Sequence, residues 1–91
     1  MNSVLVRLPE ALGRAIGRRE FPVEAATVGR AIAALDALSH GLSDRICDER
    51  GLVRKHVLLY VGDTDIRELN GLETPVTPGV TITVVAAVSG G

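Results

Sequence analysis

The side chains that most often carry chemistry in proteins are few in this chain, and their spacing does not predict a shared site. There are two histidines, His40 and His56, and one cysteine, Cys47. A cysteine nucleophile needs a base beside it, and nothing in the sequence brings either histidine to Cys47. The sequence therefore favours an idle or buried thiol at Cys47, where it would pack as a small apolar group.

Motifs for metals and phosphates are also missing. The chain has no C-x-x-C, no H-x-x-x-H and no carboxylate cluster beyond Asp63 and Asp65, which we expect to stabilise a turn through Asx-type hydrogen bonds. It has neither phosphate-binding glycine motif and no pair of groups suited to general acid–base work. We therefore predict no catalytic residue, no metal site and no bound cofactor, and we expect that the chain is not an enzyme by itself.

The remaining reactive group is the backbone carboxylate after Gly90 and Gly91. Composition alone favours a frayed end, because chain ends are usually poorly ordered. However, the two glycines follow a predicted strand, so the flexible tail over 88–91 would leave a rigid body. Extended, this tail spans about 14 Å, enough to carry a carboxylate through a narrow channel in another protein. Glycine also allows a partner to close tightly around the backbone.

Composition predicts one small domain over 1–91. The chain has 46% hydrophobic residues and a formal net charge of −1, from ten basic and eleven acidic side chains. We interpret the pairs Arg18–Arg19 and Arg54–Lys55 as isolated, solvated charges, so nucleic acid is not an expected partner. The sequence has no signal-peptide pattern and no run of about 20 apolar residues, so we expect a cytoplasmic protein without a membrane partner.

Alternation of apolar and polar residues predicts strands over 3–8, 20–25, 56–61 and 80–88. The second strand should lie near a sheet edge, because Pro22 cannot donate to a ladder. On the last two strands the expected outward side chains are apolar: Leu58, Tyr60 and Val85. The outward face of a one-sided sheet normally meets water and is polar. These three residues are therefore either a docking patch or scattered surface apolarity.

Helical spacing is clearest over 27–39. Thr27 suits the N-cap and Gly41 a left-handed exit. The expected apolar stripe consists of Val28, Ala31, Ile32, Leu35 and Leu38. We expect an ordered turn over 10–19, a short helical turn with Leu42 and Ile46 inward, and an irregular segment over 64–79. One sheet layer on one helix layer predicts an α+β protein.

Over its full length the chain resembles the MoaD/ThiS family of ubiquitin-like sulfur carriers. TPGVTITVVAAVSGG is similar to that family's last turn, strand and terminal Gly-Gly, TVGRAIAALDAL resembles its helix, and HVLLYVGDTDIR resembles its strand and turn before the crossover. YVGDTDIR looks closest to the CysO-type branch, which serves cysteine biosynthesis. Two features depart from the pattern: Pro78-Gly79-Val80 stands where the family often has Asp-Gly-Asp, and the segment over 10–19 matches weakly.

The resemblance implies an α+β, ubiquitin-like β-grasp fold, with a mixed sheet of four or five strands packed on one main helix. The first and last strands would be parallel neighbours at the sheet centre. It also implies that an E1-like adenylyltransferase/sulfurtransferase uses ATP to adenylate the Gly91 carboxylate. A persulfide or sulfide donor would then convert it to a thiocarboxylate. Gly90, Ser89 and Val88 would thread the partner's active site, and Leu58, Tyr60 and Val85 would dock.

The acceptor of the sulfur stays open at this point. A partner of cysteine-synthase type is favoured, while the large subunit of molybdopterin synthase and a thiazole-forming enzyme are alternatives. A metalloprotease acting at the C-terminus is a further possible partner. Two other functions share the tail: a protein modifier that forms isopeptide bonds through Gly91, and a non-covalent β-grasp adaptor.

Overall fold

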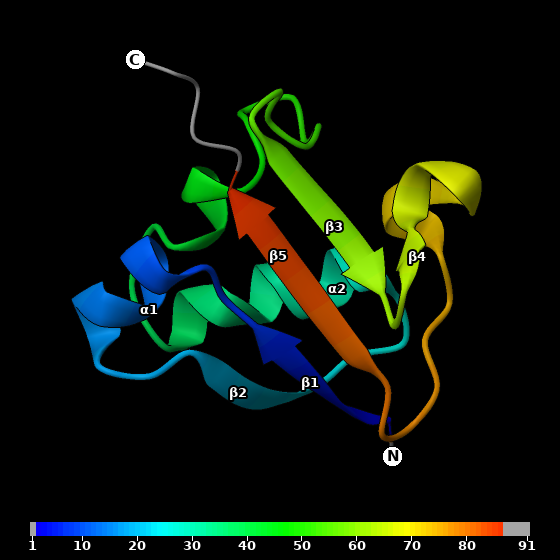
Figure 1. Cartoon of the computed structure of the whole chain (residues 1–91), viewed down its shortest axis with the longest axis horizontal. Helices are drawn as coiled ribbons and strands as arrows, with labels where there is room; N and C mark the ends of the chain where they lie inside the picture. The colour runs from blue at the N-terminus through cyan, green and yellow to red at the C-terminus, as the bar shows by residue number, and fades with distance from the viewer. Residues whose placement is uncertain (1, 87–91) are drawn as a thin grey trace.

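A mixed sheet and one main helix form two layers in the computed structural model, which describes residues 2–86 (Figure 1). The strands are β1 (Ser3–Arg7), β2 (Glu20–Glu24), β3 (Val57–Val61), β4 (Thr64–Asp65) and β5 (Thr81–Ala86). The α-helices are α1 (Glu10–Ile16) and α2 (Val28–Ala34). Short 3-10 helices are η1 (Leu35–Ala37), η2 (Ser43–Arg45), η3 (Ile66–Glu68) and η4 (Gly71–Glu73). None of the helices in the described range is long and apolar enough to cross a membrane.

The five strands lie in the order β2-β1-β5-β3-β4. β1 and β5 are parallel, with Val6 in register with Ile82, whereas the other neighbouring strands are antiparallel. The expected mixed sheet of four or five strands on one helix, with the first and last strands side by side at its centre, is therefore confirmed. Because β1 leads into α1 and β5 runs parallel to it, β5 ends on the side of the sheet where α1 lies (Figure 1).

The core lies between the sheet and α2. Its inward side chains alternate along the strands as the sequence predicts and are almost fully buried: Val4, Val6, Leu8, Val57, Leu59, Ile82 and Val84. α2 contributes Val28, Ala31 and Ile32, and Leu35 continues the same stripe. Burying one such side chain stabilises the fold by roughly 1.5–3 kcal/mol. This core makes the central strand a rigid base for whatever follows Ala86.

α2 begins as predicted but ends earlier. The Thr27 hydroxyl accepts a hydrogen bond from the backbone N–H of Arg30 at 3.2 Å, which confirms the N-cap. At Leu35 the helix tightens into η1, which has about three residues per turn. The expected place of Leu38 on the buried stripe is wrong, because the tighter turn rotates it away from the core and leaves it 45% exposed. Gly41 has the expected left-handed conformation, with φ of 83°.

The segment over 10–19 is a helix followed by a turn, so the expectation of an ordered turn alone is wrong. α1 starts after Pro9 and ends at Gly17, whose φ of 78° is the left-handed conformation that glycine adopts readily. Leu12 and Ile16 lie one turn apart and pack against the core. Gly13 lies beneath the returning chain, where a Cβ atom would be 2.9 Å from the carbonyl oxygen of Arg18.

β2 lies at one edge of the sheet, as Pro22 predicts. The β1–β2 ladder includes hydrogen bonds from Leu8 N–H to the Arg19 carbonyl and from Ala25 N–H to the Asn2 carbonyl. Bonded residues alternate along an antiparallel pair, so the backbone nitrogen of Pro22 faces the open edge. The missing N–H of proline therefore removes a donor from the position where another strand would pair.

The crossover over 64–79 is more regular than the sequence predicts, since β4, η3 and η4 lie within it. Asp65 makes the expected Asx-type turn by accepting a hydrogen bond from the backbone N–H of Arg67 at 2.8 Å. Asp63 is exposed, and the hydrogen bonds of the described residues include none that its carboxylate accepts. The expectation of inward Leu42 and Ile46 is confirmed, because they are 6% and 0% exposed.

Candidate functional site

Leu58, Tyr60 and Val85 lie together on the face of the sheet that points away from α2, and we call this patch the outward face. Leu58 is directly opposite Val85 in the β3–β5 pair, and Tyr60 is opposite Thr83. Val85 is 38% exposed, whereas Leu58 and Tyr60 are half-buried. The outward orientation predicted for all three side chains is therefore confirmed. Their role in docking stays a prediction.

The predicted tail residues Val88, Ser89, Gly90 and Gly91 lie outside the described residues. The structure does define the base of the tail. Ala86, the last residue of β5, pairs with Val57, the first residue of β3. A tail that continues from Ala86 thus starts at the end of the central strand, one residue beyond the outward-facing Val85. Docking at the outward face would therefore place a partner next to the start of the tail.

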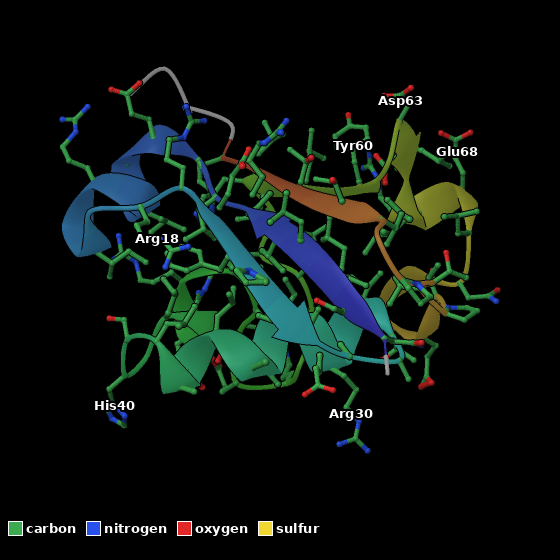
Figure 2. All side chains as sticks on the ribbon, turned by 90° about the horizontal axis from the view of Figure 1, so that it is seen from below. Arg18, Arg30, His40, Tyr60, Asp63 and Glu68 are labelled. Carbon is green, nitrogen blue, oxygen red and sulfur yellow. The ribbon has the colours of Figure 1, made fainter. Side chains whose placement is uncertain are left out.

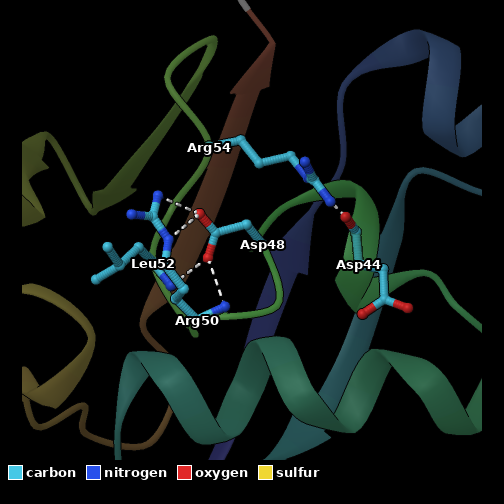
Figure 3. Close-up of polar contacts among 5 residues, drawn as sticks. All are labelled: Asp44, Asp48, Arg50, Leu52 and Arg54. Atoms are coloured by element: carbon cyan, nitrogen blue, oxygen red, sulfur yellow. Dashed lines mark hydrogen bonds and ion pairs between the residues drawn. The ribbon is translucent and has the colours of Figure 1, made fainter.

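The loop that leads into β3 is held by two arginine contacts (Figure 3). Asp48 forms an ion pair with the Arg50 guanidinium at 2.9 Å and accepts the backbone N–H of Leu52 at 3.1 Å. The Arg50 contact holds the pKa of Asp48 below its usual range. Arg54 donates through Nε to the carbonyl oxygen of Asp44 at 2.7 Å. These contacts order the loop before Val57, whose backbone N–H donates to the Arg54 carbonyl at 3.0 Å and which pairs with Ala86.

Cys47 does not form a catalytic pair in the described part of the chain. Its side chain is half-buried, and burial raises the pKa of the thiol, with the neighbouring Asp48 carboxylate adding to the rise. His40 and His56 are both exposed, and neither makes a hydrogen bond to Cys47 in the structure of residues 2–86. Within the same residues, no three His, Cys, Asp or Glu side chains are grouped to hold a metal ion.

An arginine cluster is the feature of the surface that sequence reasoning missed. Arg7, Arg18 and Arg19 line a hollow of about 360 Å³ together with Glu20. Arg18 and Arg19 are thus part of a larger group, and their interpretation as an isolated pair is wrong. β1–β2 pairing places Arg7 opposite Glu20, which follows directly on the pair. The linear sequence gives no signal for this grouping, because the contacts cross a complete helix and turn.

The fold and the position of the central strand define a ubiquitin-like β-grasp protein. The model of the ThiS family matches residues 6–91, and the chain therefore belongs to this family of sulfur carriers. The sulfur carrier protein CysO of Mycobacterium tuberculosis is 34% identical over 77 residues, which cover 82% of this chain and 83% of the relative. Its name describes a carrier and not a catalyst.

Two solved structures support the same assignment. The Amycolatopsis orientalis BexX/CysO complex matches with a TM-score of 0.86 and 32% identity, over 97% of this chain and 99% of the matched chain. The small archaeal modifier protein SAMP1 of Methanosarcina acetivorans matches with a TM-score of 0.85 and 28% identity, over 100% of this chain and 98% of that one. The first structure holds a CysO protein together with another protein, BexX.

Proposed function

We propose that this chain carries sulfur as a thiocarboxylate on Gly91, after an E1-like enzyme has adenylated the carboxylate. The observation that carries the proposal is the position of β5. β5 is the central strand of the sheet, and the family match continues from it through Gly91. A tail anchored in this way has a fixed origin, while two glycines give it a backbone slim enough for a narrow active site.

The proposed chemistry needs no side chain from the carrier. An oxygen of the Gly91 carboxylate attacks the α-phosphorus of ATP, and pyrophosphate leaves. This step replaces a poor electrophile by an acyl adenylate with a good leaving group. Sulfide then attacks the carbonyl carbon, AMP leaves, and the thiocarboxylate results. A persulfide donor would form an acyl disulfide instead, and a thiol of the enzyme would then reduce its S–S bond.

The favoured destination of the sulfur is cysteine biosynthesis, because CysO of Mycobacterium tuberculosis is among the relatives of this chain. The corresponding partner would be a synthase of cysteine-synthase type. Molybdopterin synthase and a thiazole-forming enzyme are the alternatives, and a metalloprotease acting at the C-terminus is a further proposed partner. We place the whole exchange in the cytoplasm, where a free thiol such as Cys47 persists.

Intact-mass spectrometry tests the proposal directly. The chain is incubated with an E1-like enzyme, ATP and sulfide, and its mass should increase by the difference between one sulfur and one oxygen atom. The mass of the wild-type chain should not change when ATP is left out. The mass of a variant that lacks Gly91 should not change in the complete mixture. An unchanged wild-type mass would contradict the proposal if the same enzyme has been shown to activate a sulfur carrier in parallel.

A protein modifier is the second candidate, and the likeness to SAMP1 favours it. A modifier needs the same activation of Gly91 but ends on a substrate lysine through an isopeptide bond. Conjugates would appear as a ladder of higher masses in cell extracts, whereas a carrier shows only the exchange of oxygen for sulfur. A non-covalent adaptor would differ from both, because deletion of Gly91 would leave its activity largely intact.

A further inference from the structure

Arg18 and Arg19 line two neighbouring hollows at the end of the molecule where the chain passes from α1 to β2. One hollow, of about 360 Å³, also has Arg7 and Glu20 in its lining. The other, of about 330 Å³, lies over α1 and includes Glu10 and Arg14. Figure 2 shows the acidic residues Asp63 and Glu68 at the opposite end of the molecule from Arg18. Arg18 is therefore far from these two carboxylates.

Two of the four arginines in this region have carboxylate partners, and two do not. Arg7 forms an ion pair with Glu20 at 2.8 Å, and Arg14 forms one with Glu10. Arg18 instead donates to the carbonyl oxygen of Glu20 at 3.3 Å, and Arg19 donates through Nε to the carbonyl oxygen of Leu8 at 3.2 Å. Among the described residues, no carboxylate therefore neutralises Arg18 or Arg19.

The two unneutralised guanidinium groups are already partly oriented. Arg18 lies over the ring of Phe21, with Cζ 5.0 Å from the ring centroid. Arg19 is held by its bond to Leu8, and the absence of a side chain at Gly13 lets this segment lie close against α1. A planar guanidinium that is held in place loses little conformational freedom when it binds a carboxylate in a two-pronged contact.

The arginine cluster is continuous with the outward face. Arg7 is in register with Thr83 on β5, and Thr83 is in register with Tyr60 on β3. These three residues form one row across the sheet, from the arginines at one side to the apolar patch at the other. A partner that covers Tyr60 and Val85 would thus also face Arg7. Apolar area bordered by charge is typical of protein–protein interfaces.

We propose that Arg7, Arg18 and Arg19 form a docking site for an acidic segment of a partner protein that also covers the outward face. Charge complementarity favours carboxylates, because Arg18 and Arg19 have no carboxylate partner among the described residues, while Arg7 beside them keeps its ion pair with Glu20. The adjoining apolar residues favour a protein over a nucleic acid, since the outward face has a single aromatic side chain on which a base could stack.

The proposed function suggests that the partner is the activating enzyme, so the identity of the partner rests on that proposal. The affinity of the cluster for carboxylates is independent of the proposed function. An NMR titration therefore tests the site without any enzyme. The ¹⁵N-labelled chain is titrated with a hexaglutamate peptide at low salt, and in separate samples with hexalysine and with a six-nucleotide oligouridine.

The glutamate peptide should shift the amide signals of Arg7, Arg18, Arg19 and Glu20 at millimolar concentration. Added salt should weaken these shifts, because the charges are exposed. Arg18→Glu should abolish most of them, and Arg18→Gln should reduce them. Arg30→Glu is the matched control, since Arg30 projects from α2 (Figure 2) and its reversal changes the net charge equally. Melting curves show whether each variant is folded.

Three outcomes would overturn the proposal: no shifts in the cluster with the peptide, shifts that persist in a folded Arg18→Glu variant, or tighter binding of oligouridine at the same residues. Adenylation kinetics give a second readout. Arg18→Glu should raise the KM for the carrier about tenfold while changing kcat little, as expected for a charge that guides association. Arg30→Glu should leave both constants unchanged. An equal KM for Arg18→Glu and wild type at low salt would contradict the assignment of the activating enzyme as the partner.

Discussion

Leu58 and Val85 lie directly opposite each other on β3 and β5, with both side chains on the face of the sheet that α2 does not cover. Val84, the neighbour of Val85 in the chain, is 2% exposed and belongs to the core, whereas Val85 is 38% exposed. The side chains of these two consecutive valines thus lie on opposite faces of the central strand. Substitutions at these two positions can therefore test the predicted docking role separately from stability.

Val85→Asp should weaken activation of the carrier by its enzyme while leaving the fold intact, because the new carboxylate faces solvent in the free protein. The measurement is the KM for adenylation, together with a melting curve. Val84→Asp is the control, and it should unfold the domain because it buries a charge without a partner. If Val85→Asp lowers the melting temperature as much as Val84→Asp does, Val85 belongs to the core and the docking role is wrong.

Thr27→Ala should destabilise the protein by about 1 kcal/mol, because it removes the hydroxyl that accepts the Arg30 N–H at the start of α2. In a domain of this size the melting temperature should decrease by roughly 4–8 °C. Thr27→Ser keeps the hydroxyl and should restore most of the loss. Equal melting temperatures for the alanine variant and the wild type would show that the cap contributes nothing.

Asp65→Asn should reduce stability at neutral pH and have much less effect in acid. The hydrogen bond from the Arg67 side chain is the main cause that holds the pKa of Asp65 below its usual range. The hydrogen bond from the Arg67 backbone N–H is the second cause. A lowered pKa stabilises the fold above the unfolded value of about 3.9, and this contribution is lost as the pH decreases through the folded value.

Melting curves between about pH 2.5 and pH 7 measure this effect, and the gap between wild type and Asp65→Asn should close toward the acid end. Asp63 is an exposed turn residue two positions before Asp65. Asp63→Asn is therefore the matched control and should change the melting temperature little. A gap that stays constant across the whole range would mean that the charge of Asp65 is not the cause.

Cys47→Ala should leave sulfur loading of Gly91 unchanged, because the proposed chemistry uses only the backbone carboxylate. In the wild-type protein Cys47 should react slowly with iodoacetamide at pH 7, since burial raises the pKa of the thiol and little thiolate is present. Mass spectrometry measures both the loading and the alkylation. Loss of loading in a folded Cys47→Ala variant would make this cysteine part of the reaction and would require a different mechanism.

The sheet and the main helix could be predicted from the sequence because their signals are local and repeated. Alternation placed Val4, Val6, Ile82 and Val84 inward, and the N-cap at Thr27 fixed the start of α2. The outward face followed from the same alternation, since every second side chain of a strand lies on the opposite side. The central, parallel pair of the first and last strands came from the family resemblance and not from the alternation, and the rest of the strand order was not predicted.

Other features depended on contacts that no short window of sequence contains. The sequence does not predict α1, because Gly13 and Gly17 lower helix propensity. In the structure, Gly13 allows the close approach of the returning chain, and Gly17 forms the left-handed C-cap. Leu38 was misplaced because periodicity does not show where an α-helix tightens into a 3-10 turn. The arginine cluster arises only when β1 pairs with β2 and brings Arg7 beside Glu20.

The central position of β5 ties the proposed site of modification at Gly91 to the completeness of the fold. The last residues of a domain usually tolerate change, unless they are tied into the fold by burial and hydrogen bonds. Here, a chain cut before Ile82 and Val84 would lose the middle of its sheet as well as its tail. Such a fragment would lose the proposed docking surface, so it should not compete with the intact chain for the proposed activating enzyme.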